Sequence, residues 1–136
     1  MTKRSPKRGA ISTVATLTMT RENHDETVND GIVFIDFWAE WCGPCKRFAP
    51  VFEKASEVHT DVIFAKVDTE DQRDLSAMYG VTSIPTLVIY RDGIPVFSQP
   101  GALPGNVLED LVGQVRALDM ADVRASYEKQ LAEHRH

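Results

Sequence analysis

The sequence IVFIDFWAEWCGPC, residues 32–45, is the most informative part of this chain. Its first half, Ile32–Trp38, is a nearly continuous apolar run, typical of a strand that is covered on both faces at the centre of a sheet. Two cysteines three positions apart, Cys42 and Cys45, follow closely. Pro44 between them suits the first turn of a helix, where its missing N–H costs nothing. The stretch therefore predicts a buried strand that leads into a cysteine pair at the start of a helix.

Strands and helices are expected to alternate on both sides of this stretch, because apolar runs alternate with helical spacing. The predicted strands span residues 14–19, 32–38, 62–67, 86–90 and 94–98, and the predicted helices span residues 21–30, 44–60 and 104–118. A further short helix is expected after a capping box at residues 69–72, with Leu75, Met78 and Tyr79 on its buried face. Pro50 should kink the second helix, and Pro95 marks the last strand as a sheet edge. The fold class is α/β, with a central mixed sheet of about five strands and about four helices.

The chain is expected to hold one domain, residues 11–118, between two extensions. Residues 1–10 are basic and predict a flexible tail, with an organelle transit peptide as a less favoured alternative. Residues 119–136 lie beyond the domain, and apolar residues recur in them at helical spacing, which predicts an added amphipathic helix, with a frayed tail as the alternative. Those residues are Met120, Val123, Tyr127 and Leu131.

Composition argues against several classes of function. The net charge of −5 argues against a nucleic-acid binder, which usually has a basic face. No apolar run approaches the roughly 18 residues of a membrane span, so the expected location is the cytoplasm. Two cysteines are too few for a disulfide-stapled secreted domain. Structural zinc is disfavoured as well, since zinc needs four ligands and the four histidines lie far from the pair. We therefore expect neither a metal nor a cofactor.

The position of Cys42 predicts redox chemistry. A free thiol with a pKa near 8.5 is only about 3% ionised at pH 7. At a helix N-terminus, unpaired N–H groups and the helix dipole favour the thiolate, which is the nucleophilic form. Cys45 lies one helical turn later, so both sulfurs fall on the same side of the helix. Cys42 should attack a substrate disulfide and be exposed, and Cys45 should resolve the mixed disulfide and be buried.

The chain resembles the thioredoxin family over roughly residues 14–118. The likeness begins with FWAEWCGPCK, residues 37–46, and continues through Pro50, AKVD at 65–68, YGV at 79–81, IPT at 84–86, DG at 92–93 and GAL at 101–103. Several ordered motifs at family spacing are stronger evidence than one cysteine pair. The resemblance implies a thioredoxin fold, protein disulfides as substrates and a thioredoxin reductase as the electron donor.

The resemblance also implies a role for several residues around the cysteines. Asp36 matches the family's buried acid, which would take the proton of Cys45, and Lys66 matches the lysine that accompanies it. An aspartate inside an apolar strand is costly unless it is paired or protonated, which agrees with this role. For Lys66 alone, a surface lysine with a buried stem is the favoured interpretation. Trp38, Gly43 and Pro44 would support the site.

The resemblance further implies a docking surface for substrates. Pro85 matches the family's cis-proline, which faces the disulfide. Backbone at Ile84 would pair with an extended substrate segment. Trp41, Gly101 and Ala102 would complete a small apolar rim around the cysteines.

The function predicted from the sequence is a monomeric protein-disulfide reductase that serves cell redox homeostasis. An alternative is a thioredoxin-like binding or chaperone module whose thiols are incidental to its task. Residues 119–136 motivate this alternative. It would leave the full set of Cys42, Cys45, Asp36 and Pro85 unexplained, because binding alone needs none of that chemistry.

Overall fold

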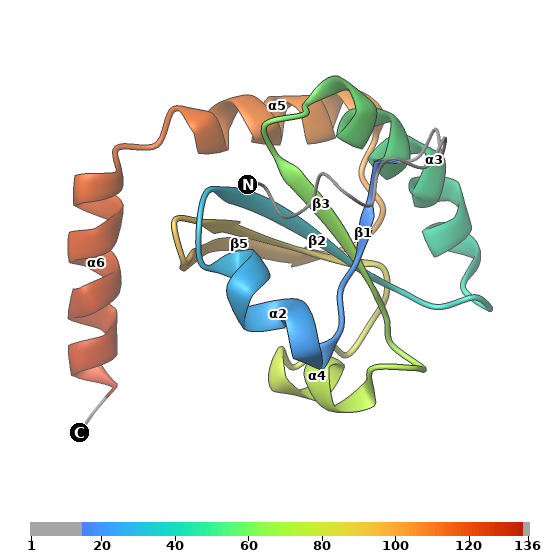
Figure 1. Ribbon diagram of the computed structural model, residues 1–136, viewed down its shortest axis with the longest axis horizontal. Coiled ribbons are helices and arrows are strands. Elements are labelled where there is room, and N and C mark those ends of the chain that lie inside the picture. Colours follow the sequence, from blue (N-terminus) through green and yellow to red (C-terminus); the bar gives the residue numbers. More distant parts are fainter. Residues whose placement is uncertain (1–14, 135–136) are drawn as a thin grey trace.

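A five-stranded mixed sheet forms the centre of the molecule (Figure 1). The computed structural model describes residues 15–134. The strands lie in the order β1-β3-β2-β4-β5. They are β1 Leu17–Thr18, β2 Ile32–Trp38, β3 Ile63–Asp68, β4 Thr86–Arg91 and β5 Ile94–Pro100. β1, β3 and β2 run parallel, and β4 runs antiparallel to both β2 and β5. The predicted α/β class and mixed sheet are confirmed.

The central strand β2 places successive side chains on opposite faces of the sheet, as the pleat requires. Phe34 belongs to an apolar cluster with side chains of α3 (Gly43–Val58) and α5 (Gly105–Arg116). Val33 and Ile35 belong to a second cluster with residues of α2 (Arg21–Val28) and α4 (Arg73–Met78). α3 and α5 thus cover one face of the sheet, and α2 and α4 cover the other. Figure 1 shows these helices on opposite sides of the sheet. Double coverage explains why the β2 sequence is apolar at nearly every position.

The start of the sheet differs from expectation. β1 has only two residues, and Val14 at the beginning of the predicted strand lies outside the described residues. The predicted tail at residues 1–10 lies outside them as well.

The predicted capping box at residues 69–72 is wrong. The Thr69 hydroxyl donates instead to the carbonyl oxygen of Trp38, at 3.1 Å. Asp68 Oδ1 accepts the backbone N–H of Glu70 at 2.9 Å, so an aspartate turn at the end of β3 replaces the box. α4 then begins only at Arg73. Met78, in the last turn of α4, has 62% of its surface exposed, so the prediction of a buried Met78 is wrong.

His24 is a buried histidine with partners on both ring nitrogens. Nδ1 lies 2.8 Å from Asp25 Oδ1, and Nε2 lies 2.5 Å from the Tyr79 hydroxyl. The Tyr79 hydroxyl in turn lies 2.7 Å from that of Tyr90 on β4. These bonds tie α2 to the sheet, so His24 has a structural role.

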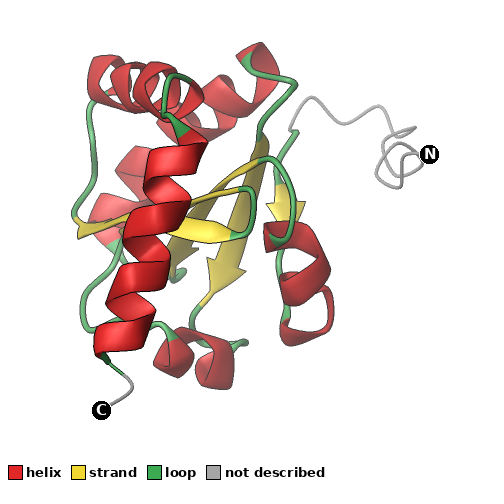
Figure 2. Ribbon diagram, turned by 90° about the vertical axis from the view of Figure 1, so that its left-hand side faces the viewer, coloured by secondary structure: helices red, strands yellow, loops and turns green. Residues whose placement is uncertain are grey.

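The C-terminal extension forms the helix α6, Met120–Glu133. Asp119 caps it by accepting the N–H groups of Ala121 and Asp122. α6 stands beside the edge strand β5, away from the two helix layers (Figures 1 and 2). None of its residues is buried. The predicted C-terminal helix is present, but it packs loosely.

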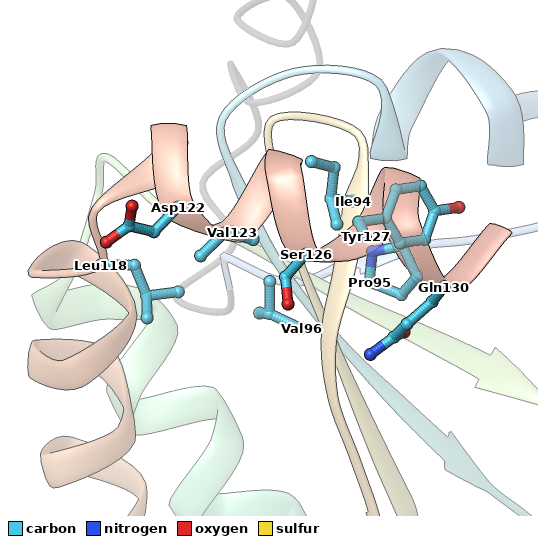
Figure 3. A pocket seen from close by; sticks show the side chains of 9 residues that line it. All are labelled: Ile94, Pro95, Val96, Leu118, Asp122, Val123, Ser126, Tyr127 and Gln130. Atoms are coloured by element: carbon cyan, nitrogen blue, oxygen red, sulfur yellow. The ribbon is translucent and has the colours of Figure 1, made fainter. Parts of the chain in front are cut away.

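A cleft of about 400 Å³ separates α6 from β5 (Figure 3). Apolar side chains of β5 line one wall, and Val123 and Tyr127 of α6 line the other. The complete lining is Ile94, Pro95, Val96, Leu118, Asp122, Val123, Ser126, Tyr127 and Gln130.

Among residues 15–134, no helix is long and apolar enough to cross a membrane.

Candidate active site

The two cysteines lie at the start of α3, just after the short segment that follows β2. Cys42 is the N-cap residue of α3, and Gly43 and Pro44 begin the helix, as the sequence predicted. Cys42 and Cys45 form a disulfide with their Cα atoms 5.2 Å apart. The backbone N–H of Cys45 points at Cys42 Sγ, with a nitrogen–sulfur distance of 3.2 Å. In the reduced state, the same N–H would stabilise a thiolate on Cys42.

Both cysteines are buried in the disulfide form. Cys42 is 3% exposed and Cys45 is 2% exposed, so the expectation of an exposed first cysteine is wrong for this state. The pair packs with Ala39, Trp38 and Ile84, which cover the sulfurs from the side. Helix spacing predicted the relative position of the sulfurs but carried no information about this apolar cover.

Pro85 lies in the loop before β4, directly after Ile84, which packs against the cysteine pair. The Ile84–Pro85 peptide bond is cis, as the resemblance implied. The carbonyl oxygen of Ile84 lies 3.7 Å from Cys42 Sγ. The carbonyl oxygen of Pro85 accepts the N–H of Gly101 at 2.8 Å. The loops that carry Ile84, Pro85 and Gly101 thus meet beside the cysteines, and Gly101 and Ala102 are exposed there.

Trp41 is the large exposed apolar group next to the pair, with 69% of its surface accessible. Its indole N–H donates to Glu70 Oε2 at 3.2 Å, which orients the ring. Glu70 is a site residue that sequence reasoning missed. No local pattern marks it, since it lies 29 positions from Trp41.

Asp36 is buried at 1% exposure on the face of β2 that carries Phe34 and faces α3. Within residues 15–134, its two carboxylate oxygens are the buried side-chain polar atoms that lack a hydrogen-bond partner. Burial raises the pKa of Asp36 from 3.8 to about 7, although the positive charge of Lys66 lowers it in part. The carboxyl group can therefore gain or lose a proton near neutral pH.

Lys66 is the register partner of Asp36 on the neighbouring strand β3. Its ammonium nitrogen forms an ion pair with Glu53 of α3, at 3.4 Å from Oε2. It also lies 5.1 Å from the centre of the Trp38 ring, a cation–π arrangement. Glu53 was missed in the sequence, because its distance from Lys66 depends on how α3 packs on the sheet.

Among the described residues, no group of three or more histidine, cysteine, aspartate or glutamate side chains could hold a metal ion.

Comparison with known proteins places the chain in a family. The model of the family "Thioredoxin" matches residues 15–114. "Putative thioredoxin 2" of Streptomyces coelicolor is 54% identical over 120 residues, covering 88% of this chain and 90% of that protein. The thioredoxin of Alicyclobacillus acidocaldarius is 39% identical over 103 residues, covering 74% of this chain and 98% of its own length.

Solved structures agree with these sequence matches. A mutant thioredoxin from Halobacterium salinarum superposes with a TM-score of 0.71 at 34% identity, covering 81% of this chain and 98% of that one. The thioredoxin of Malassezia sympodialis gives a TM-score of 0.67 at 33% identity, covering 76% and 93%. With a disulfide at the start of α3 and a cis-proline beside it, the chain belongs to the thioredoxin family and is a protein-disulfide oxidoreductase.

Proposed function

We propose that the chain reduces protein disulfides with Cys42 as the nucleophile and Cys45 as the resolving thiol. The observation that carries this assignment is the geometry at the start of α3. The Cys45 N–H points at Cys42 Sγ, and Cys42 occupies the N-cap. Both features stabilise negative charge on Cys42 and not on Cys45.

The reaction consists of two exchanges. The Cys42 thiolate attacks one sulfur of the substrate disulfide, forms a mixed disulfide and releases the other sulfur as a thiolate. Cys45 then loses its proton and attacks Cys42 Sγ. The Cys42–Cys45 disulfide forms, and the second substrate thiolate leaves. Two electrons have passed to the substrate, and the protein is left in the oxidised state that the structure describes.

Asp36 is assigned as the group that takes the proton of Cys45, directly or through water. It is buried on the side of β2 that faces α3, and its pKa of about 7 lets it accept a proton at neutral pH. Lys66, in register with it, adjusts how strongly the carboxyl group holds that proton.

The docking surface is assigned to Trp41, Ile84, Pro85, Gly101 and Ala102. These residues come from three loops around the sulfurs, and an extended substrate segment could pair with the backbone at Ile84. The substrates are protein disulfides and the electron donor is a thioredoxin reductase. A cytoplasmic, monomeric protein that serves cell redox homeostasis, with residues 11–118 as its catalytic domain, fits this function.

A trapping experiment tests the assignment of the two cysteines. A Cys45→Ser variant should hold substrates as mixed disulfides through Cys42, because the resolving thiol is gone. Mass spectrometry of the trapped species would locate the bond. A Cys42→Ser variant is the matched control and should trap little. Equal trapping by both variants, or none by either, would show that the roles are assigned wrongly.

The reduction potential separates a reductase from its oxidising relatives. We expect a two-electron potential below about −200 mV, measured by equilibration with glutathione or dithiothreitol. A value far above this would indicate an oxidase or isomerase. Full cellular activity of a Cys42→Ser, Cys45→Ser double variant would instead favour a binding or chaperone module.

A further inference from the structure

The Lys66 side chain stands between two carboxylates. Asp36 is its register partner on β2, and Glu53 reaches it from α3. The ammonium nitrogen lies 3.4 Å from Glu53 Oε2, while neither oxygen of Asp36 has a hydrogen-bond partner within residues 15–134. The cation is therefore bound to the outer acid, and the buried acid stays unpaired.

We propose that Glu53 is a positioning residue for the buried acid: it holds the Lys66 ammonium over Trp38 and keeps it from pairing with Asp36. The inference rests on the proposed function, in which Asp36 is the proton acceptor for Cys45. Glu53 touches none of the reacting atoms and acts on the reaction mainly through Lys66, with a smaller direct effect of its own charge on Asp36.

The reason for such a device lies in what an ion pair would do to the buried acid. An opposite charge close to a carboxylate favours its ionised form and lowers its pKa. If Lys66 paired fully with Asp36, the carboxylate would remain ionised and become a weak base for a thiol proton. With the ammonium on Glu53, burial dominates instead, and the pKa of Asp36 stays near 7.

The charged neighbours of Asp36 form a short and complete set among the described residues. Lys66 from β3 lowers its pKa, and Glu53 from α3 raises it. Cys45 at the start of α3 titrates only after reduction, and the register partner on β4 is the apolar Leu87. Lys66 faces the uncharged Thr18 on its other side. The competition for the cation is therefore confined to two acids.

The Lys66–Glu53 ion pair is partly buried, so Glu53 can compete with Asp36 for the Lys66 ammonium. The Lys66 side chain is 18% exposed and that of Glu53 is 34% exposed, so solvent screens their pair less than a surface pair. The Trp38 ring, 5.1 Å from the ammonium, fixes where the cation lies when Glu53 binds it.

The test is the titration of Asp36 in a Glu53→Gln variant. The oxidised protein is used, so that the cysteines do not titrate, and the Asp36 carboxyl carbon is followed by NMR. We expect the midpoint to fall by about one pH unit, because the freed ammonium turns to Asp36. Glu57→Gln is the matched control, since it removes the same charge from an exposed site one turn further along α3. In the Glu57→Gln variant, the titration midpoint of Asp36 should not change.

The same substitution in a Lys66→Met background shows whether Glu53 acts through the lysine. The shift caused by Glu53→Gln should shrink to less than half, because no cation remains to be released. An equal shift in both backgrounds would overturn the proposal, as Glu53 would then act on Asp36 by its charge alone. An unchanged or raised midpoint in the single variant would overturn it as well.

The pH dependence of turnover separates this inference from the proposed function. When a disulfide peptide is reduced at several pH values, the acidic limb of the rate profile should move down with the Asp36 midpoint in Glu53→Gln. If the midpoint moves and the profile does not, Glu53 positions Lys66 as proposed and Asp36 is not the proton acceptor. If the midpoint stays fixed, the positioning role fails, whatever the profile does.

Discussion

Asp36 shows what a sequence can and cannot say about one side chain. Its place in the apolar run Ile32–Trp38 indicated an acid that must be paired or protonated if it is buried, because burial penalises the charged form. The choice of partner by Lys66 could not be predicted. It depends on how close α3 brings Glu53, and that distance is set by packing between elements far apart in the chain. For the same reason Glu70, which orients Trp41, was missed.

The raised pKa of Asp36 makes stability depend on pH. The folded-state pKa of about 7 lies above the ordinary value of 3.8, so the folded protein holds this proton more tightly than the unfolded chain. The resulting stabilisation is complete below pH 3.8 and is lost as the pH rises through 7. At about 1.4 kcal/mol per pH unit, the oxidised protein should lose about 2–3 kcal/mol of unfolding free energy between pH 5 and pH 8.

An Asp36→Ala variant should lose this dependence, as measured by urea denaturation at both pH values. Replacement of the exposed Asp110 by alanine is the control and should keep it. A variant at Asp36 that retained the full dependence would show that another group binds the proton.

Helices and strands were predicted well where their own side-chain pattern determines where they begin and end. β2 and α3 follow from an apolar run and from helical spacing, and both begin and end within two residues of expectation. The start of α4 was mistaken because two local patterns competed. Thr69 could cap a helix, but Asp68 formed a turn first and Thr69 bonded to Trp38. Which pattern forms depends on the Trp38 carbonyl of β2, about 30 positions earlier in the chain. A pattern of neighbouring residues such as the capping box does not include that contact.

The C-terminus of α5 is held by a side chain from another element. Arg91 of β4 donates from Nη1 to the carbonyl oxygen of Val115 at 2.7 Å and to that of Arg116 at 3.3 Å. A cation at this end of a helix meets unpaired carbonyls and the negative end of the dipole. Arg91→Met should therefore lower the free energy of unfolding by about 1–2 kcal/mol, because partly buried carbonyls lose a charged donor.

Arg73→Met is the comparison for this prediction in the same urea denaturation. Its ion pair with Glu70 is 77% and 51% exposed and should contribute little. Equal losses in the two variants would mean that Arg91 acts as an ordinary surface charge and does not secure α5.

The helix layers and the edge of the sheet could be predicted from two features of the sequence. A strand covered on both faces needs helices on both sides, and an edge strand with a proline ends the sheet. The place of α6 did not follow. Its apolar spacing predicted a helix with one buried face, yet Val123 and Tyr127 are only half-buried across an open cleft from β5. Spacing shows that a helix has an apolar face, and it does not show how closely that face will pack.

Loose packing of α6 predicts that the domain is stable without it. No residue of α6 is buried, and the apolar clusters on the two faces of the sheet are made by residues up to Leu118. A chain that ends after Leu118 should therefore melt within a few degrees of the full-length protein, since a large change requires the loss of buried apolar surface.

The shortened chain should also reduce a disulfide peptide at the full-length rate, because the cysteines lie at the start of α3 and the cleft lies between α6 and the sheet edge β5. Thermal denaturation in the oxidised state and peptide turnover together check both statements. The control is Leu108→Ala, which shortens a buried side chain of α5 and should lower the free energy of unfolding. That change leaves a cavity in the main cluster and should cost about 2–5 kcal/mol. If shortening the chain were as damaging as this cavity, α6 would have to close onto β5 in solution and form part of the core.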